Sequence, residues 1–104
     1  MPNFMIAYHG GDEPGSKKEG AAQLEKWKAW VKGLGDRVVN PGTPLTNSTL
    51  VTSTQVAQDD DPNAMKGFAV VEADSIEAAV EIAQSDPFLA NGGIICVSEM
   101  MEMK

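Results

Sequence analysis

The order of apolar and polar residues near the N-terminus predicts a strand with two apolar faces. Successive side chains of a strand point to opposite sides of the sheet, and both sides here are largely apolar. One face carries Phe4, Ile6 and Tyr8, and the other carries Met5, Ala7 and His9. We therefore expect a strand over Asn3–His9.

After a polar loop, the spacing of apolar residues changes to three and four, which predicts a helix over Lys17–Lys32. The residues on its apolar face are Leu24, Trp27, Val31 and Leu34. A second helix is expected to start at Asp74-Ser75, because these side chains can cap exposed backbone N–H groups. It is expected to end at Ser85-Asp86-Pro87, since the residue before a proline disfavours helical conformation. The predicted buried stripe of this helix consists of Ile76, Ala79, Val80 and Ala83.

Three further segments are predicted to be strands, namely Asp36–Asn40, Gly67–Ala73 and Ile94–Ser98. The first runs into Pro41 and Pro44, which a central strand would tolerate poorly, so it belongs at a sheet edge. Ser48–Val56 is rich in threonine, serine and valine and predicts an extended hairpin arm. The acidic segment Asp59–Asn63 predicts a solvated turn.

The resulting order, β-α-β-β-α-β with an extra hairpin arm, indicates an α+β protein with a ferredoxin-like fold. In this topology the strands over Asn3–His9 and Gly67–Ala73 are central, and both helices cover one face of the sheet. Because both faces of the central strands are apolar, the helix-free face also needs cover, which a second copy of the chain would supply. We expect a homodimer.

Length and charge narrow the classes of function. The chain has 104 residues, so we expect a single domain over residues 1–104. A net charge of -7 opposes binding to nucleic acids and to anionic membranes. The lone cysteine, Cys96, cannot form an intrachain disulfide, and we expect neither a leader sequence nor a membrane span. The composition predicts a cytoplasmic protein, and the motifs of nucleotide, flavin or haem sites are absent, so no cofactor is expected.

The end of the first strand is the predicted site. The topology brings His9, the only histidine, to the same end of the sheet as Asp86, which follows the second helix. A carboxylate beside an imidazole can fix its tautomer and orient it as a general base. We expect His9 to be the base and Asp86 its partner, with Tyr8, Trp27 and Phe88 as walls of a small-molecule pocket.

Other interpretations of the same residues stay open. His9 can simply close a strand and contact solvent or backbone. A metal site could combine His9, Asp12, Asp86 and the acidic turn Asp59–Asp61, but no ligand spacing supports one, so no metal is expected. Cys96 lies within an apolar strand, where we expect a buried, unreactive thiol.

Several segments carry a family resemblance. Gly67–Ala79 (GFAVVEADSIEAA), Ser85–Phe88 (SDPF), Gly92-Gly93 and Val97 resemble the C-terminal half of YCII-related domains, and FMIAYHGG is similar to the first strand of one branch. The resemblance implies a dimeric α+β barrel and a histidine–aspartate pair as a candidate active site. Asp86 carries over through Asp86-Pro87-Phe88. The histidine does not, because the first predicted helix contains none, and Asp61-Pro62-Asn63 replaces a related branch's Asp-Gly-Pro-Phe motif.

Two functions of different classes follow. The first is a small-molecule protein that binds or transforms an organic ligand by acid–base chemistry at His9 and Asp86. The second is a non-catalytic dimeric module for interaction or ligand sensing. The fold alone does not choose between them, since ferredoxin-like scaffolds carry unrelated functions. A solvent-accessible cavity beside the predicted site would favour the first.

Overall fold

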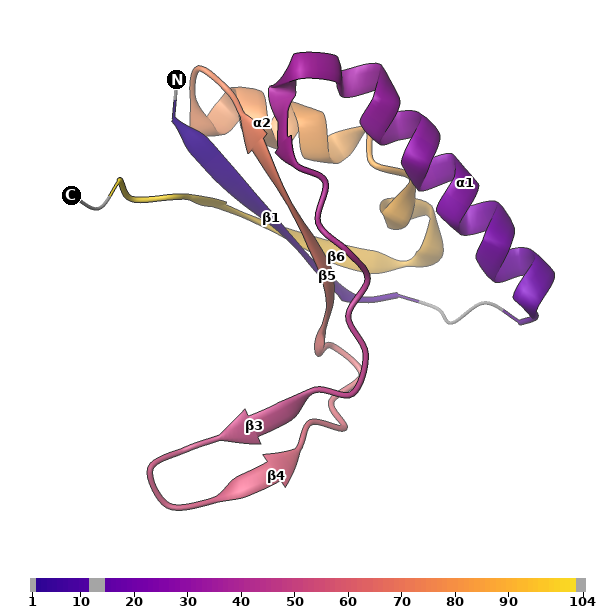
Figure 1. The fold of residues 1–104 in the computed structure, drawn as a ribbon, viewed down its shortest axis with the longest axis vertical. Helices are drawn as coiled ribbons and strands as arrows, with labels where there is room; N and C mark the ends of the chain where they lie inside the picture. The colour runs from indigo at the N-terminus through magenta and orange to yellow at the C-terminus, as the bar shows by residue number, and fades with distance from the viewer. Residues whose placement is uncertain (1, 12–14, 103–104) are drawn as a thin grey trace.

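A computed structural model describes residues 2–11 and 15–102 of the chain. The elements in chain order are β1 (Asn3–Gly10), α1 (Lys17–Leu34), the short 3-10 helix η1 (Gly35–Arg37), β2 (Val38–Asn40), β3 (Thr49–Val51), β4 (Val56–Gln58), β5 (Met65–Glu72), α2 (Ile76–Gln84), the 3-10 helix η2 (Pro87–Asn91) and β6 (Gly93–Glu99). Figure 1 shows their arrangement.

Four strands form one antiparallel sheet in the order β2-β5-β1-β6. The two long central strands are β1 and β5, and β2 lies at the edge, as the sequence predicts. Both helices lie on the same side of this sheet (Figure 1). The arrangement is ferredoxin-like, so the predicted fold class is confirmed.

The first helix begins at Lys17 as predicted, the second begins just after the predicted cap at Ser75, and both have a serine at the N-cap. The Ser16 side chain accepts a hydrogen bond from the backbone N–H of Glu19, and Ser75 accepts one from Ala78. These bonds satisfy amides that have no partner inside the helix. The buried stripe of α2 differs from the predicted one: it consists of Ala79, Ile82 and Ala83, whereas Ile76 and Val80 are 39% and 38% exposed. Both sets have helical spacing, and packing against the sheet selects one of them.

The core lies between the sheet and the helices. On this side of the sheet the fully or nearly fully buried residues are Phe4, Ile6, Tyr8, Ala69 and Val71. They pair directly across the central strands, for example Ile6 with Ala69. Trp27 and Trp30 of α1 pack against this cluster while remaining partly exposed. The strict alternation of burial along β1 therefore reflects one face packed under helices.

The opposite face of the sheet has no helix over it (Figure 1). Its central rows are Met5, Ala7 and His9 on β1, Phe68 and Val70 on β5, and Ile94, Cys96 and Ser98 on β6. Ile94 is 57% exposed. Cys96 is also exposed, so the prediction of a buried thiol is wrong. The apolar sequence around Cys96 belongs to a strand face that no element of the same chain covers.

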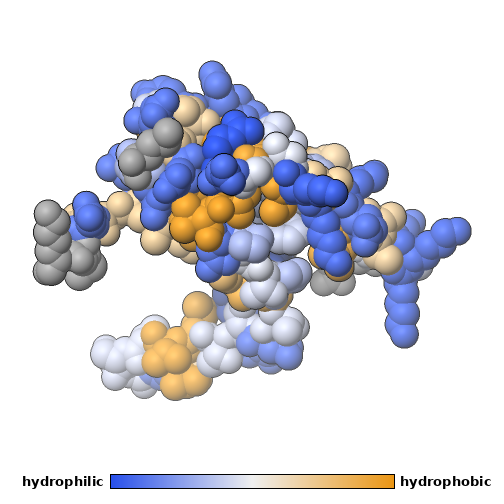
Figure 2. Space-filling model, turned by 45° about the horizontal axis from the view of Figure 1, so that its top comes forward, coloured by the Kyte–Doolittle hydropathy of each residue, from blue (hydrophilic) through white to orange (hydrophobic). Residues whose placement is uncertain are grey.

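The strands β3 and β4 form a separate two-stranded hairpin that projects away from the main sheet, here called the arm (Figures 1 and 2). Its turn is at Thr52–Gln55, where the Thr52 N–H donates to the Gln55 carbonyl. The predicted arm, Ser48–Val56, therefore covers the first strand and the turn, and the second strand continues to Gln58. Apolar side chains on the arm are exposed: Leu50, Val51 and Val56.

Within residues 2–11 and 15–102, no helix combines the length and apolar character that crossing a membrane would require.

Candidate functional site

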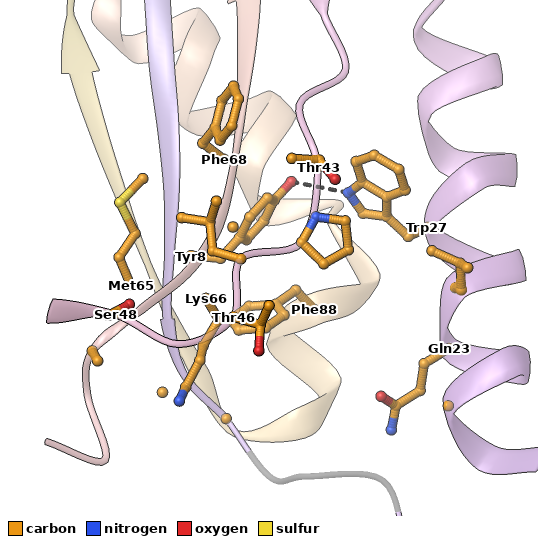
Figure 3. Close-up of a pocket in the computed structure, with 18 of the residues that line it drawn as sticks. Tyr8, Gln23, Trp27, Thr43, Thr46, Ser48, Met65, Lys66, Phe68 and Phe88 are labelled. Atoms are coloured by element: carbon orange, nitrogen blue, oxygen red, sulfur yellow. Dashed lines mark hydrogen bonds between the residues drawn. The ribbon is translucent and has the colours of Figure 1, made fainter. Parts of the chain in front are cut away.

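A cavity of about 680 Å³ opens beside β1 and β5, between α1, η2 and the segment that leads into the arm. This volume is within the range of small-molecule sites in proteins. Figure 3 shows the cavity with aromatic side chains from β1, α1 and η2 around it. Tyr8, Trp27 and Phe88, the three residues predicted as pocket walls, all line it.

The outer wall of the cavity comes from residues 43–48, which run along β5 after β2 ends. Pro44 forms an isolated bridge with Gly67, and the Leu45 N–H donates to the Lys66 carbonyl at 2.8 Å. Gly42 permits this approach because its φ is +70° and a Cβ there would overlap the Phe68 carbonyl oxygen. Residues 43–48 all line the cavity, and these backbone contacts attach the segment to β5.

The chemical centre of the cavity is the hydroxyl group of Tyr8. It donates to Oδ2 of Asp86 at 2.5 Å and accepts from Nε1 of Trp27 at 3.2 Å. Asp86 is only 3% exposed and does not line the cavity, so Tyr8 stands between this carboxylate and any ligand. A phenol oxygen has two lone pairs, and Trp27 occupies one, which leaves the other for a ligand donor.

The local structure after α2 explains the position of Asp86. This residue caps η2, with its Oδ1 accepting from the Phe88 N–H at 2.9 Å. Pro87 follows at the first position of η2, where its fixed φ suits the turn and its missing N–H costs nothing. The two oxygens of Asp86 therefore have different tasks: one holds η2 and the other holds Tyr8.

Burial raises the pKa of Asp86, and the hydrogen bonds from Tyr8 and Phe88 only partly offset that effect. Burial also raises the pKa of Tyr8 far above its usual range, and the neighbouring Asp86 adds to the rise. Tyr8 therefore keeps its proton, and its hydroxyl group donates a hydrogen bond to the Asp86 carboxylate. The carboxylate, when ionised, is a stronger base than one in water.

Phe88 is held in the cavity wall by two glycines. A Cβ at Gly93 would come within 2.1 Å of the Phe88 ring, and one at Gly11 within 3.2 Å. The ring also lies 4.9 Å from that of Tyr8, at an interplanar angle of 57°. This tilted contact is a favourable arrangement for two aromatic rings, and it fixes one side of the cavity.

The structure does not bring His9 and Asp86 together as predicted. His9 follows Tyr8 along the strand and lies on the helix-free face, where its Nδ1 is 3.1 Å from the Asn63 carbonyl oxygen. Asp86 lies under the helix-covered face and bonds Tyr8. Both residues are at the expected end of the sheet, but the alternation of strand side chains separates them. Asp86 therefore has a tyrosine, not a histidine, as its partner.

Sequence reasoning missed the polar residues of the outer wall and mouth. They come from the segment after β2, the start of β5 and α1: Thr43, Thr46, Ser48, Lys66 and Gln23. The signal that could have found them is the pair of prolines at positions 41 and 44, which marks a chain that leaves the sheet ladder. The described residues contain no group of three or more His, Cys, Asp or Glu side chains able to hold a metal ion. Asp12, one of the ligands considered, lies outside the described residues.

The arrangement can move a proton away from a bound hydroxyl group. A ligand O–H that donates to Tyr8 would pass its proton to the Tyr8 oxygen as Tyr8 passes its own to Asp86. One O–H bond of the ligand breaks, one carboxyl O–H forms, and Tyr8 is unchanged at the end. Trp27 holds the phenol oxygen in place for this exchange. The geometry therefore supplies a buried base that acts through a tyrosine.

Comparisons with known proteins agree with this architecture. The family profile described as the YCII-related domain matches residues 7–104. Among solved structures, the chain is similar to 5-chloro-2-hydroxyhydroquinone dehydrochlorinase of Burkholderia phenoliruptrix, determined in complex with 2,5-dihydroxybenzoquinone. The identity is 21% and the TM-score is 0.61, over 97% of this chain and 95% of that one. No curated protein matches the chain significantly.

Proposed function

The chain belongs to the family of YCII-related domains, and we propose that its cavity binds a small hydroxylated cyclic molecule and removes a proton from it. The observation that carries the proposal is the hydroxyl group of Tyr8 at the cavity wall, bonded to the buried Asp86 and to Trp27. In this proposal Asp86 is the base and Tyr8 relays the proton.

The shape of the cavity supports a ring as the ligand. The flat rings of Trp27 and Phe88 line the cavity next to Tyr8, Trp27 at its hydroxyl group and Phe88 against its ring (Figure 3). Aromatic side chains favour stacked or tilted contacts with another ring. The structural neighbour was solved with 2,5-dihydroxybenzoquinone, a hydroxylated six-membered ring, so this fold accommodates such molecules in one known case.

Binding and turnover can be measured separately. Trp27 lines the cavity, so its fluorescence should change when 2,5-dihydroxybenzoquinone or an unsubstituted hydroquinone enters. Trp30 is the only other tryptophan, and a Trp30→Phe background isolates the signal. Turnover can be followed as chloride release from 5-chloro-2-hydroxyhydroquinone.

Tyr8→Phe and Asp86→Asn are the decisive variants. Tyr8→Phe removes the relaying hydroxyl group while keeping the ring against Phe88, so we expect turnover to fall roughly 100-fold, within the usual range for general base catalysis. Asp86→Asn should have a similar effect on turnover and a smaller one on binding. The same assay tests the role predicted for His9: His9→Gln should leave turnover within about threefold. A loss of turnover in His9→Gln alone would overturn the assignment to Tyr8 and Asp86.

Binding without turnover would favour the second function, a ligand-sensing or interaction module. The apolar helix-free face favours assembly in either case. We propose that two copies of the chain pack through this face as a homodimer, so that the two sheets form an α+β barrel. We also propose a cytoplasmic location, with which the free, exposed thiol of Cys96 is compatible.

A further inference from the structure

The charged side chains that line the cavity include more cations than anions, unlike the chain as a whole. They are Lys26, Lys66 and Asp59, whereas the Asp86 carboxylate lies buried behind Tyr8. The complete chain carries -7. The net charge of the chain repels an anionic ligand at long range. Cationic residues in the lining therefore indicate that the cavity accepts an anionic group.

Lys66 is the better placed of the two cations. It lies on β5, its own carbonyl accepts from the Leu45 N–H of the outer wall, and its ammonium group has no ion pair or hydrogen bond with any residue the structure describes. Asp59 forms no ion pair with it, and one oxygen of that carboxylate accepts from the Asp61 N–H at 3.1 Å. A charge-assisted donor is therefore available at the mouth of the cavity.

The two polar ends of the cavity are separated by an aromatic wall. In Figure 3 the Tyr8 hydroxyl and Trp27 lie at one end, the Lys66 ammonium and the Gln23 amide at the other, and the Phe88 ring lies between. A ligand that uses both ends needs a donor group on one side of a ring and an anionic acceptor on the other.

We propose that the ligand is a small hydroxylated aromatic acid, whose hydroxyl group meets Tyr8 and whose carboxylate meets Lys66. This inference rests on the proposed function, because it names the substrate class of the same cavity. Lys66 would then be the residue that selects an acid over a neutral phenol of equal size.

Isothermal titration calorimetry with 4-hydroxybenzoate and its neutral isostere 4-hydroxybenzamide tests the proposal. We expect the acid to bind roughly tenfold more tightly than the amide at low salt, since a hydrogen bond to a charged group contributes that order of affinity. The preference should shrink at high ionic strength, because the Lys66 end is exposed.

Lys66→Gln should abolish most of the preference and leave the affinity for the amide within about twofold. The matched control is Lys28→Gln, which removes the same charge from an exposed position of α1 outside the cavity lining. It should keep the preference. Lys26→Gln shows whether the second lining cation shares the role, and a loss there with none in Lys66→Gln would overturn the assignment to Lys66.

The outcomes separate the two proposals. Equal binding of acid and amide, both weakened by Tyr8→Phe, would overturn the aromatic acid and leave the proposed function standing. No binding of either probe, nor of the quinone and hydroquinone above, would overturn both.

Discussion

The phenol oxygen of Tyr8 makes hydrogen bonds to a buried carboxylate and to an indole, and Tyr8 also lines the open cavity. The three residues come from different elements: Tyr8 from β1, Trp27 from α1 and Asp86 from the cap of η2. A change in any one of the three elements therefore alters the position of this oxygen. The site is fixed by tertiary packing, even though its central residue lies in a long central strand.

The pKa of Asp86 makes a testable link between this site and stability. Burial raises that pKa above its ordinary value of 3.8. Between this value and the raised one, the folded chain binds more protons than the unfolded chain, so stability falls as pH rises through that window. Asp86→Asn does not titrate. We therefore expect the difference in free energy of unfolding to shift in favour of the variant as pH rises from about 4, measured by urea denaturation. A difference that is flat with pH, or shifts the other way, would contradict the raised pKa.

The same pKa predicts how turnover depends on pH. The base must be ionised, so activity should rise with pH through the raised pKa of Asp86 and then level off. No fall is expected near neutral pH, because Tyr8 keeps its proton throughout that range.

At the residue scale, the sequence contained the information for the correct pair. Alternation along the first strand placed Tyr8 with Phe4 and Ile6, and His9 on the other face. Asp86 follows a helix that covers the face of Tyr8, so its side chain lies on the same side of the sheet as Tyr8 and on the opposite side from His9. The prediction placed Asp86 at the right end of the sheet but did not apply alternation to choose its partner. The position of Lys66 at the cavity could not be predicted from the sequence, because it depends on the path of residues 43–48.

At the scale of elements, the passage of the chain from β2 to the arm depends on Gly42. Its positive φ and its closeness to the Phe68 carbonyl exclude a side chain. Gly42→Ala should therefore destabilise the protein by at least about 2 kcal/mol or displace residues 43–48, with loss of ligand affinity. Thermal denaturation and the Trp27 fluorescence titration check these two effects.

Gly33→Ala is the matched control for Gly42→Ala. Gly33 lies near the end of α1, and outside the backbone of its own helix and its chain neighbours no described atom is within 4 Å of where its Cβ would be. An alanine there should be neutral or stabilise the helix by about 0.5–1 kcal/mol. Equal behaviour of the two variants would show that the wall does not depend on the glycine conformation.

The sequence predicted elements better than their connections. Alternation and helical spacing located β1, α1 and β5 because burial on one face enforces those periods. The 3-10 helix η2 and the second strand of the arm were not foreseen, since both are too short to show a period. Yet η2 carries Phe88, and the base of the arm lines the cavity. The least periodic segments therefore contribute much of the site.

At the scale of the whole molecule, the proposed dimer has a direct test. Ala7 is central on the helix-free face, with Phe68 on one side and Cys96 on the other. Ala7→Glu places a charge in the middle of the proposed interface, so we expect a dimer in the parent and a monomer in the variant, measured by sedimentation. Ala21→Glu, at an exposed position of α1, makes the same change elsewhere and should stay dimeric.

A strand residue such as Ala7 could also perturb folding, so a second variant keeps the test clear. Ile94 is 57% exposed on the same face, and Ile94→Lys should weaken the dimer without unfolding the protein. Circular dichroism reports whether each variant is folded. A parent chain that sediments as a monomer at micromolar concentration would contradict the dimer.

The outer wall, which only a few backbone bonds attach to β5, has a consequence for how such proteins diverge. The residues that hold the proton-moving pair belong to the sheet, a helix and a capped turn, where most substitutions are costly. Residues 43–48 and the arm tolerate replacement and changes of length more readily. Substitutions in residues 43–48 and the arm can therefore change which substrate this scaffold binds, in evolution or by engineering, while the residues that move the proton stay the same.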